Sequence, residues 1–475
     1  MAGVSASGLR AALPTLRPYQ LEPLRAIVQS VRGRLGRSFS VEVARQGGKN
    51  ELSAQLELFL LAAHARQALD GVKAAPTFSP QARLSLRRLW QRIEQAGLRQ
   101  LASREAGHIV RVGRARQIFL SAEPGANVVG HTAHLLLEID EAQDVDPDKF
   151  DRDFRPMAAA NNATVVFYGT AWSETSLLER AKQAHLEAER RDGVRRHFEY
   201  DWTAVARYVP AYAAYVEAER LRLGEDHPLF QTQYCLRTLA GAGRLFSPAQ
   251  QAQLQGSHPR LRTPEPGERY AAGLDLAGEA GPGDMHHRDD TVLTIGRLHD
   301  AGDSLFPGVR IEVVDHLAWT GERHDVVVPR LVDLLREVWR VRRVAVDATG
   351  LGEPIARALV VALGPSRVAP VKFSAERKSA LGYGLLAAVN TGRLKLYASD
   401  GSPEVREFWR QAERARAVYR PGGTLNFFVD PSEGHDDYLT SLALLVEAAS
   451  GAEPRRAFGR QGGERPERGH PRGLA

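Results

Sequence analysis

A short glycine-rich segment near the N-terminus has the residues needed to bind the phosphates of a nucleotide. Positions 41–51 read VEVARQGGKNE, and Gly47, Gly48 and Lys49 stand between a strand-like stretch (39–43) and a helical pattern. Backbone N–H groups and a helix N-terminus face an anion at such a junction, and a lysine there reaches the β- and γ-phosphates. The segment is therefore a candidate phosphate-binding loop.

The loop departs from the GxxxxGK[ST] pattern in two places. Val43 stands where the first glycine would be, and Asn50 stands where a hydroxyl residue would bind Mg²⁺. The side-chain carbonyl oxygen of Asn50 is still a ligand for Mg²⁺, although a weaker arrangement is expected. A glycine turn that leads into a helix without any ligand is the alternative that this loop alone leaves open.

A second segment, HLLLEIDEAQ at 134–143, supplies acidic residues of the kind that complete such a site. Its apolar run is typical of a strand buried on both faces of a parallel sheet, and the run ends in Asp140 and Glu141. At the carboxyl end of the strand, Asp140 can hold Mg²⁺ through water and Glu141 can orient or deprotonate the attacking water. A buried strand followed by a solvated acidic loop is the alternative. Together with the upstream loop, the segment favours a site that hydrolyses ATP.

Four further carboxylates stand out in the C-terminal half. Asp275 lies in GLDLAG, Asp347 lies in VAVDATG, and Asp436 and Asp437 open a helix in GHDDYLTSLALL. Taken singly, these acids are better explained as strand-ending turns or as a helix N-cap. Taken together, they favour a site for two Mg²⁺ or Mn²⁺ ions that would relieve their mutual repulsion and hydrolyse a phosphodiester.

Three neighbouring residues are ambiguous. His435 is either an extra metal ligand or proton shuttle, or a local hydrogen-bonding residue beside the helix start. Asp289 and Asp290 either approach the acidic site from the preceding strand or belong to a hairpin turn.

The elements that position the first two motifs alternate between strand-like and helix-like segments, which is typical of a parallel sheet covered by helices. The expected strands are 39–43, 72–78, 109–112, 117–121, 135–139 and 164–168, and the expected helix among them is 83–98. The N-terminal half is thus predicted to be an α/β P-loop ATPase domain of the ASCE or RecA-like type with a mainly parallel sheet. Gly169 and Thr170 follow the last strand and either sense the γ-phosphate or form an ordinary turn.

The second half begins a new sheet. Three successive strands (270–276, 291–298 and 309–317) precede a helix (326–341), a strand (343–346) and a final helix (436–449). This order predicts a ribonuclease-H-like fold. The predicted domains are an ATPase motor at 1–245, a linker at 246–268, a nuclease at 269–450 and a basic, disordered tail at 451–475.

The composition of the 475 residues is that of an ordinary globular protein, with a net charge of +6 that is compatible with a nucleic-acid partner. The single cysteine, Cys235, cannot form an internal disulfide, so a reducing cytoplasm is expected. No apolar run approaches the length of a membrane span, and no export signal is expected at the N-terminus.

The motifs ARQGGKNE, LLLEIDEAQ, GLDLAG, VDATGLG and GHDDYLTSLAL, in this order, resemble those of the large terminase subunit of tailed bacteriophages. The resemblance extends from Tyr19 to about Ala449. It implies an N-terminal ATPase that drives double-stranded DNA into a procapsid and a C-terminal nuclease that cuts concatemeric DNA. The Arg- and Gly-rich tail departs from the family, so no tail contacts are transferred.

The resemblance also implies roles for individual residues. Gln20, in RPYQ, would read the adenine, Glu141 would be the catalytic carboxylate, and Gly169 and Thr170 would couple ATP hydrolysis to movement of DNA. The implied ATP-binding residues are Gln20, Arg45, Gln46, Gly47, Gly48, Lys49, Asn50 and Asp140. The implied nuclease residues and metal ligands are Asp275, Asp347, Asp436 and Asp437, with Asp436 and Asp437 as alternatives for the main ligand.

Partners follow from the resemblance as well. They are double-stranded DNA, the portal protein of the procapsid, the small terminase subunit and further copies of the chain in a ring during packaging, all in the host cytoplasm and with no membrane. A state outside the ring, including a monomer, stays open. No second ATPase core is visible that could supply an arginine, so a neighbouring subunit is expected to do so, with Arg114, Arg116 and Arg155 as candidates.

Two other functions remain possible on these residues. One is an ATPase fused to a nuclease in DNA repair or restriction. The other is a DNA-binding ATPase whose nuclease site is inactive. ATP turnover without a portal partner would favour the first, and absence of metal-dependent cutting would favour the second.

Overall fold

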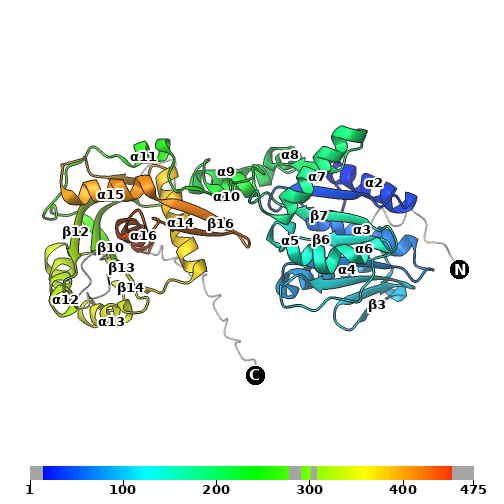
Figure 1. Ribbon diagram of the computed structural model, residues 1–475, viewed down its shortest axis with the longest axis horizontal. Helices are drawn as coiled ribbons and strands as arrows, with labels where there is room; N and C mark the ends of the chain where they lie inside the picture. The colour runs from blue at the N-terminus through cyan, green and yellow to red at the C-terminus, as the bar shows by residue number, and fades with distance from the viewer. Residues whose placement is uncertain (1–13, 278–289, 301–307, 452–475) are drawn as a thin grey trace, which may run out of the picture.

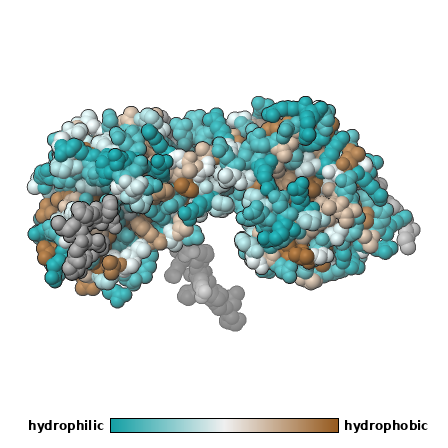
Figure 2. Space-filling view, viewed as in Figure 1, coloured by the Kyte–Doolittle hydropathy of each residue, from teal (hydrophilic) through white to brown (hydrophobic). Residues whose placement is uncertain are grey.

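The computed structural model describes residues 14–277, 290–300 and 308–451, which form two lobes connected by a group of helices (Figure 1). The predicted tail lies outside the described residues except for Gly451, and Asp289 also lies outside them. Within the described part of the chain, no helix is both long enough and apolar enough to cross a membrane. On the face shown in Figure 2, hydrophilic residues predominate over both lobes and the hydrophobic residues are scattered among them. Single apolar residues of this kind are ordinary on a protein surface.

The N-terminal lobe is built on an eight-stranded sheet in the described residues, with the strand order β3-β4-β5-β2-β6-β7-β1-β8. The six strands from β5 to β8 in this order are parallel, and β3 and β4 add an antiparallel edge. The strands are β1 (Ser38–Val43), β2 (Asp70–Ala75), β3 (Ala102–Glu105), β4 (Ile109–Val112), β5 (Ala115–Ser121), β6 (Leu136–Ile139), β7 (Thr164–Gly169) and β8 (His197–Tyr200). The phosphate-loop strand β1 and the acidic strand β6 are separated by β7 alone, so both motifs end at the same edge of the sheet.

Helices cover both faces of this sheet. They are α2 (Pro18–Gly33), α3 (Lys49–Ala63), α4 (Arg83–Gln95), α5 (Pro147–Lys149), α6 (Arg155–Ala159) and α7 (Leu177–Asp192). Leu52, Leu56 and Leu60 of α3 are at most 3% exposed and pack in one core with β1, because their spacing places them on one side of the helix. Ile139 and Leu177 belong to another core that includes α7.

Three helices lie between the lobes in Figure 1: α8 (Trp202–Ala206), α9 (Pro210–Leu223) and α10 (Pro228–Gln233). The fully buried side chain of His227 caps α10 by accepting from the N–H of Leu229 through Nδ1. Its Nε2 lies 3.1 Å from the backbone oxygen of Tyr383 in the C-terminal lobe. This imidazole therefore joins the connecting helices to the second lobe.

The C-terminal lobe contains a six-stranded sheet in the described residues, in the order β14-β13-β10-β11-β12-β15. Strands β10, β11 and β12 are antiparallel, and β13 and β14 continue the sheet in parallel with β10. These strands are β10 (Arg269–Asp275), β11 (Asp290–His299), β12 (Arg310–Thr320), β13 (Arg343–Asp347), β14 (Val368–Val371) and β15 (Leu394–Leu396). The three antiparallel strands followed by parallel additions confirm the predicted ribonuclease-H-like class, and the other lobe confirms the predicted parallel α/β sheet.

The final helix, α16 (Asp437–Ser450), crosses one face of this sheet. It approaches β10 so closely that a Cβ on Gly273 would lie 2.0 Å from the oxygen of Ser441. The remaining helices of the lobe are α11 (Pro248–Leu254), α12 (His324–Asp333), α13 (Gly352–Leu363), α14 (Ala375–Asn390) and α15 (Pro403–Arg414). The close contact holds the start of α16 beside the ends of β10 and β13.

Residues 246–268, expected to form a linker, pack against the C-terminal lobe. Phe246 is fully buried in the core of that lobe, and the N–H of Leu261 donates to the oxygen of Val314. The preceding strand β9 (Ala242–Arg244) pairs with β16 (Arg416–Arg420), which forms a hairpin with β17 (Thr424–Phe428). The chain thus joins the packing of the second lobe from about residue 242.

Candidate nucleotide and metal sites

The backbone of the candidate phosphate-binding loop requires glycine at two positions. Gln46 and Gly48 both have positive φ values, 60° and 100°. A Cβ on Gly47 would lie 2.6 Å from Cγ1 of Val43 and 2.8 Å from the oxygen of Ala44. The two glycines are needed for different reasons, since Gly48 needs conformational freedom and Gly47 needs space.

Lys49 and Glu141 contact each other across the site. Nζ of Lys49 lies 3.2 Å from Oε2 of Glu141, and Lys49 is 8% exposed. Burial alone would raise the pKa of Glu141, but the charges of Lys49 and Arg45 and a hydrogen bond from Gln143 lower it below its ordinary value. Glu141 is therefore an ionised carboxylate at neutral pH, and its oxygen is held by the lysine of the loop.

Asp140 is buried at the end of β6 and is held by groups from two other elements. Its Oδ2 accepts a hydrogen bond of 3.1 Å from Ser85 of α4, and the ammonium of Lys73 lies 3.9 Å away. Lys73 of β2 is itself buried and bonds to Ser53 and Glu57 of α3. These contacts fix the carboxylate at the sheet edge, where it fits the predicted role of a support for Mg²⁺.

A cavity of about 560 Å³ contains most of the predicted nucleotide-site residues, and this volume is within the ordinary range of small-molecule sites. The predicted residues that line it are Arg45, Gln46, Gly47, Gly48, Lys49, Asn50, Asp140, Glu141 and Thr170. Gly169 lies next to Thr170, and a Cβ there would meet Oε1 of Gln143 at 2.2 Å. The structure therefore brings the acidic motif and the loop motif together with the predicted coupling turn.

Gln20, the expected adenine reader, contacts the phosphate-binding loop. Its Nε2 donates to the oxygen of Gly48 at 2.9 Å, and its Oε1 accepts from the N–H of Arg17. The hydroxyl of Tyr19 likewise donates to the oxygen of Gly47 at 2.6 Å. With both ends of its amide engaged and only 2% of its surface exposed, Gln20 braces the phosphate-binding loop and does not line the cavity.

The sequence reasoning missed Gln143, which links the acidic motif to the Gly169–Thr170 turn, the predicted coupling turn. Its Nε2 donates to Oε2 of Glu141 at 2.8 Å, and its Oε1 accepts from the N–H of Thr170 at 3.3 Å. A single amide thus connects the carboxylate with the backbone that follows β7. Its place two residues after Glu141 was visible in the sequence, but the direction of the side chain was not.

The three arginines expected to reach the ATP site of a neighbouring subunit lie in separate environments. Arg116 forms two bonds of 2.7 Å to Asp70, whereas the exposed Arg155 lies 3.6 Å from Asp151. Arg114 is exposed, and none of the three lines the cavity of its own subunit. Arg88, for which the sequence suggested no role, does line it.

The second site lies at the carboxyl ends of β10 and β13. These strands pair in parallel with Leu274 opposite Val346, so Asp275 and Asp347 follow at adjacent positions. Asp436 and Asp437 reach the same place from the start of α16. Burial raises the pKa of Asp275 well above its ordinary value, and the charges of Asp437, Asp347 and Asp436 raise it further. The four predicted carboxylates therefore act on one another electrostatically.

The cluster of Asp275, Asp347, Asp436 and Asp437 fits divalent cations. The carboxylate oxygens are hard ligands of the kind that Mg²⁺ and Mn²⁺ prefer, and a cation would offset the unfavourable ionisation of Asp275. Among the described residues, the oxygens of these acids do not all lie within 4.8 Å of one another. The ligands of two ions about 4 Å apart are spread over a larger distance than the ligands of a single ion.

Other residues around the second site have defined contacts. Nζ of Lys378 lies 3.5 Å from Oδ2 of Asp436, and the backbone N–H of Asp290 donates to Oδ2 of Asp437 at 2.8 Å. The side chain of Asp290 accepts from Thr320, so Asp290 contributes to the site through its backbone. Burial would raise the pKa of Glu407 in α15, but hydrogen bonds from Arg410 and Gln411 lower it below its ordinary value, and His435 lies close enough to act on the same carboxylate.

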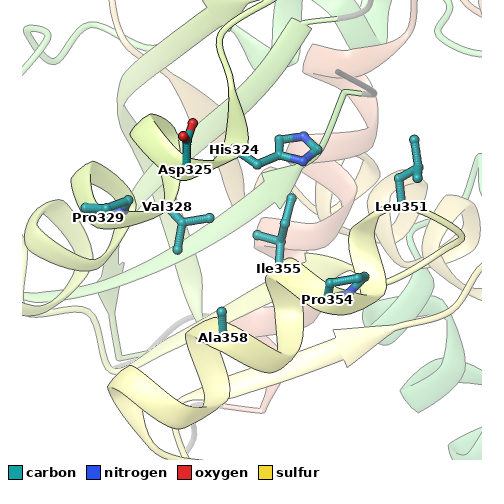
Figure 3. Close-up of a pocket in the computed structure, with 8 residues that line it drawn as sticks. All are labelled: His324, Asp325, Val328, Pro329, Leu351, Pro354, Ile355 and Ala358. Atoms are coloured by element: carbon teal, nitrogen blue, oxygen red, sulfur yellow. The ribbon is translucent and has the colours of Figure 1, made fainter. Parts of the chain in front are cut away.

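An apolar groove lies between α12 and α13 (Figure 3). Its lining residues are His324, Asp325, Val328, Pro329, Leu351, Pro354, Ile355 and Ala358. His324 also contacts the backbone oxygen of Ala277, just after β10. The groove contains none of the four aspartates.

A separate cluster contains Glu42, His197 and Glu199 on β1 and β8, with ligand atoms within 4.8 Å of one another. Nζ of Lys182 lies 2.7 Å from Glu199 and 3.4 Å from Glu42. The protein's own ammonium group therefore already supplies a cation at this position.

Neither a protein-family model nor a curated protein sequence matches the chain. Among solved structures, the large terminase from a thermophilic bacteriophage in its crystal form 2 is similar, with a TM-score of 0.55 at 12% sequence identity. The alignment covers 91% of this chain and 99% of that chain. The same phage protein in complex with ADP has a TM-score of 0.54 at 12% identity, again over 91% of this chain and 99% of that chain. At this identity the likeness is one of fold, and the chain therefore has the fold of a bacteriophage large terminase over most of its length.

Proposed function

We propose that this protein is the ATP-hydrolysing and DNA-cutting subunit of a viral DNA-packaging motor. One observation carries the proposal: a single chain with the large-terminase fold contains both the Lys49–Glu141 cavity and the four-aspartate site. The first site fits ATP with Mg²⁺, and the second fits a DNA phosphodiester with Mg²⁺ or Mn²⁺.

In the ATP site, the phosphates compete with Glu141 for the ammonium of Lys49. Loss of that ion pair leaves Glu141 free to orient the attacking water and to accept its proton. Asp140 and the amide oxygen of Asn50 would hold Mg²⁺, which would neutralise charge on the phosphates. Because Gln143 bonds both to Glu141 and to the backbone of Thr170, movement of the carboxylate is transmitted to the Gly169–Thr170 turn.

In the nuclease site, Asp275, Asp347 and one or both of Asp436 and Asp437 would hold two divalent ions. The ions would activate water and stabilise the leaving 3′ oxygen. Until they bind, Asp275 is protonated more readily than an ordinary aspartate, so metal binding is expected to release protons.

The similar phage structures suggest the biological setting, because the solved proteins are large terminases, including one in complex with ADP. In that setting the substrate is concatemeric double-stranded DNA, and the partners are a portal protein, a small terminase subunit and further copies of the chain in a ring. The protein would act in the host cytoplasm and assemble transiently at the procapsid portal.

Two activities measured on the full-length protein test this function. Glu141→Gln is expected to abolish ATP turnover and leave metal-dependent plasmid cleavage, whereas Asp347→Ala is expected to do the reverse. Addition of portal-bearing procapsids, small subunit and ATP is expected to protect DNA from added nuclease. ATP turnover and cutting without any such protection would instead favour a repair or restriction enzyme.

A further inference from the structure

Arg88 lies on the side of α4 that faces the nucleotide cavity. It lines the cavity together with Leu84 and Ser85 of the same helix, which precede it by four and three positions, and with Gln81 of the turn before α4. Such spacings place side chains on one face of a helix. The adjacent Arg87 is exposed and does not line the cavity.

Contacts on both sides of Arg88 hold this face in place. Three residues before it, Ser85 donates to Oδ2 of Asp140 at 3.1 Å. Four residues after it, Arg92 makes bonds of 2.8 Å from Nε and Nη2 to the carboxylate of Glu51 in α3. Because α3 begins at the phosphate-binding lysine, α4 is joined to both halves of the ATP site, and Arg88 lies between the two joints.

The guanidinium of Arg88 is half-buried and has no hydrogen-bond or ion-pair partner in the described ranges of the chain. The other cationic groups of the cavity are already engaged. Lys49 contacts Glu141, and Nη1 of Arg45 donates to Oε1 of Gln233 at 2.5 Å. A partly desolvated guanidinium without an anion is unfavourable, and phosphate oxygens in this cavity would provide the missing acceptors.

We propose that Arg88 contacts the γ-phosphate of ATP bound in its own subunit and stabilises the charge that develops during hydrolysis. This inference rests on the proposed ATPase function and adds an arginine in cis to the one expected from a neighbouring subunit. The planar guanidinium can bond to two phosphate oxygens at once, which a lysine ammonium does less well. The residue acts in cis because α4 belongs to the same lobe as the phosphate-binding loop.

The test compares steady-state ATP turnover by full-length wild type, Arg88→Ala and Arg88→Lys, with Arg87→Ala as the matched control on the same helix. We expect Arg88→Ala to lower kcat by about 100-fold or more while the affinity for ADP and the Tm stay close to wild type. Arg88→Lys should recover only a small part of kcat. Arg87→Ala should keep wild-type turnover.

Mixing two inactive variants separates action in cis from action in trans. Arg88→Ala keeps an intact phosphate-binding loop, whereas Lys49→Ala keeps Arg88 but cannot use ATP. If Arg88 acts in cis, the mixture stays inactive at every ratio. Recovery of turnover in the mixture, or Arg88→Ala with near-wild-type kcat, would overturn the inference and leave the ATPase proposal intact. Wild-type protein without any ATP turnover would instead remove the proposed function itself.

Discussion

The backbone N–H of Gly422 donates a hydrogen bond to Oδ1 of Asp144, with 3.1 Å between the two atoms. Gly422 is at the turn of the β16–β17 hairpin in the C-terminal lobe, and Asp144 lies three residues after the catalytic candidate Glu141. Nearby, Nε1 of Trp172 donates to the oxygen of Arg420 at 2.9 Å. The hairpin therefore contacts the N-terminal lobe beside both the acidic motif and the Gly169–Thr170 turn.

We expect Asp144→Ala to weaken this contact, because the N–H of Gly422 loses its acceptor. The expected loss is about 1–3 kcal/mol in the free energy of unfolding, together with faster protease cleavage in the hairpin. Asp144→Asn is the matched control, since its Oδ1 can still accept from Gly422, although its Nδ2 cannot accept the hydrogen bond that Gln143 donates to Oδ2 of Asp144. Burial and the charge of Glu141 raise the pKa of Asp144 to about 6, so loss of the charge costs little at pH 7.5 and the Asn variant should be more stable than the Ala variant. Equal behaviour of the Ala and Asn variants would contradict this role of the hydrogen bond.

Gln143 is expected to be needed for efficient hydrolysis, because its amide holds Glu141 and the backbone of Thr170 together. Gln143→Ala should lower kcat for ATP by roughly 10-fold or more, with little change in nucleotide affinity. Stopped-flow binding of a fluorescent ADP analogue would measure the affinity in the same preparation. A variant that loses affinity and keeps kcat would show that Gln143 supports nucleotide binding and not the position of Glu141.

The positions of the acidic motif residues could be predicted from the sequence, because these residues lie at the ends of buried strands. A buried, mainly apolar run such as 135–139 indicates a central strand, and a central parallel strand presents its last residues at the edge of the sheet where ligands bind. Asp140, Asp275 and Asp347 are at such ends in the structure. The same logic explains why the two fold classes could be predicted without any contact information.

Side-chain direction and contacts between lobes could not be predicted in this way. Gln20 turns towards Gly48, and Arg88 faces the cavity, because of packing between elements that are distant in the chain. The spacing of Gln81, Ser85 and Arg88 was a detectable signal, but only knowledge of which face of α4 meets the ATP site makes it informative. The packed segment at 246–268 was hidden for another reason, since its prolines and glycines are equally typical of a free linker.

Gly273 and Gly384 provide a matched pair of glycine substitutions with opposite expected effects. A Cβ at Gly273 would lie 2.0 Å from the oxygen of Ser441 and 2.3 Å from the nitrogen of Leu445, so Gly273→Ala must separate β10 from α16. We expect a loss of about 3 kcal/mol or more. Gly384 is inside α14 with no atom within 4 Å of such a Cβ, and Gly384→Ala should stabilise the protein by about 0.5–1 kcal/mol. Chemical denaturation monitored by circular dichroism measures both, and a tolerant Gly273→Ala would contradict the close helix–strand contact.

His227 is expected to weaken the junction between the lobes at acidic pH. Burial lowers its pKa from 6.5 to about 4, so the unfolded chain binds a proton at a higher pH than the folded chain does. Its contribution to stability is therefore present above pH 6.5 and is lost as the pH falls towards 4, with about 2 kcal/mol lost at pH 5. Protonation also removes the lone pair of Nδ1 that accepts from Leu229.

His227→Asn provides the comparison, because Asn can cap a helix but does not titrate in this range. We expect the variant to be less stable than wild type at pH 7.5 and to lose less stability between pH 7.5 and 5. Burial also lowers the pKa of His185 and His316, to about 4 and about 3, so some acid sensitivity remains in the variant. The difference between the two proteins is the relevant quantity, and parallel pH profiles would refute the assignment to His227.

Asp275 is expected to stabilise the metal-bound protein and to destabilise the metal-free protein. Burial and three neighbouring aspartates raise its pKa well above 3.8, so the folded state holds a proton that the unfolded state has already released. The stability that this proton provides is present at low pH and is lost as the pH rises through the raised pKa. At neutral pH without metal, Asp275→Asn should therefore raise the Tm, since it removes one charge from the cluster.

Bound metal is expected to reverse this difference in Tm between wild type and Asp275→Asn. Mg²⁺ or Mn²⁺ should raise the Tm of wild type and should have little effect on Asp275→Asn, which should also lose metal-dependent plasmid cleavage. Asp325→Asn is the control for removal of a charge from the same lobe, because Asp325 is exposed and paired with Arg323. It should keep both the metal-induced shift and the cutting activity. If Asp275→Asn kept the metal-induced shift in Tm, the ions would bind elsewhere, and the electrostatic cluster at the end of β10 would have to be explained without them.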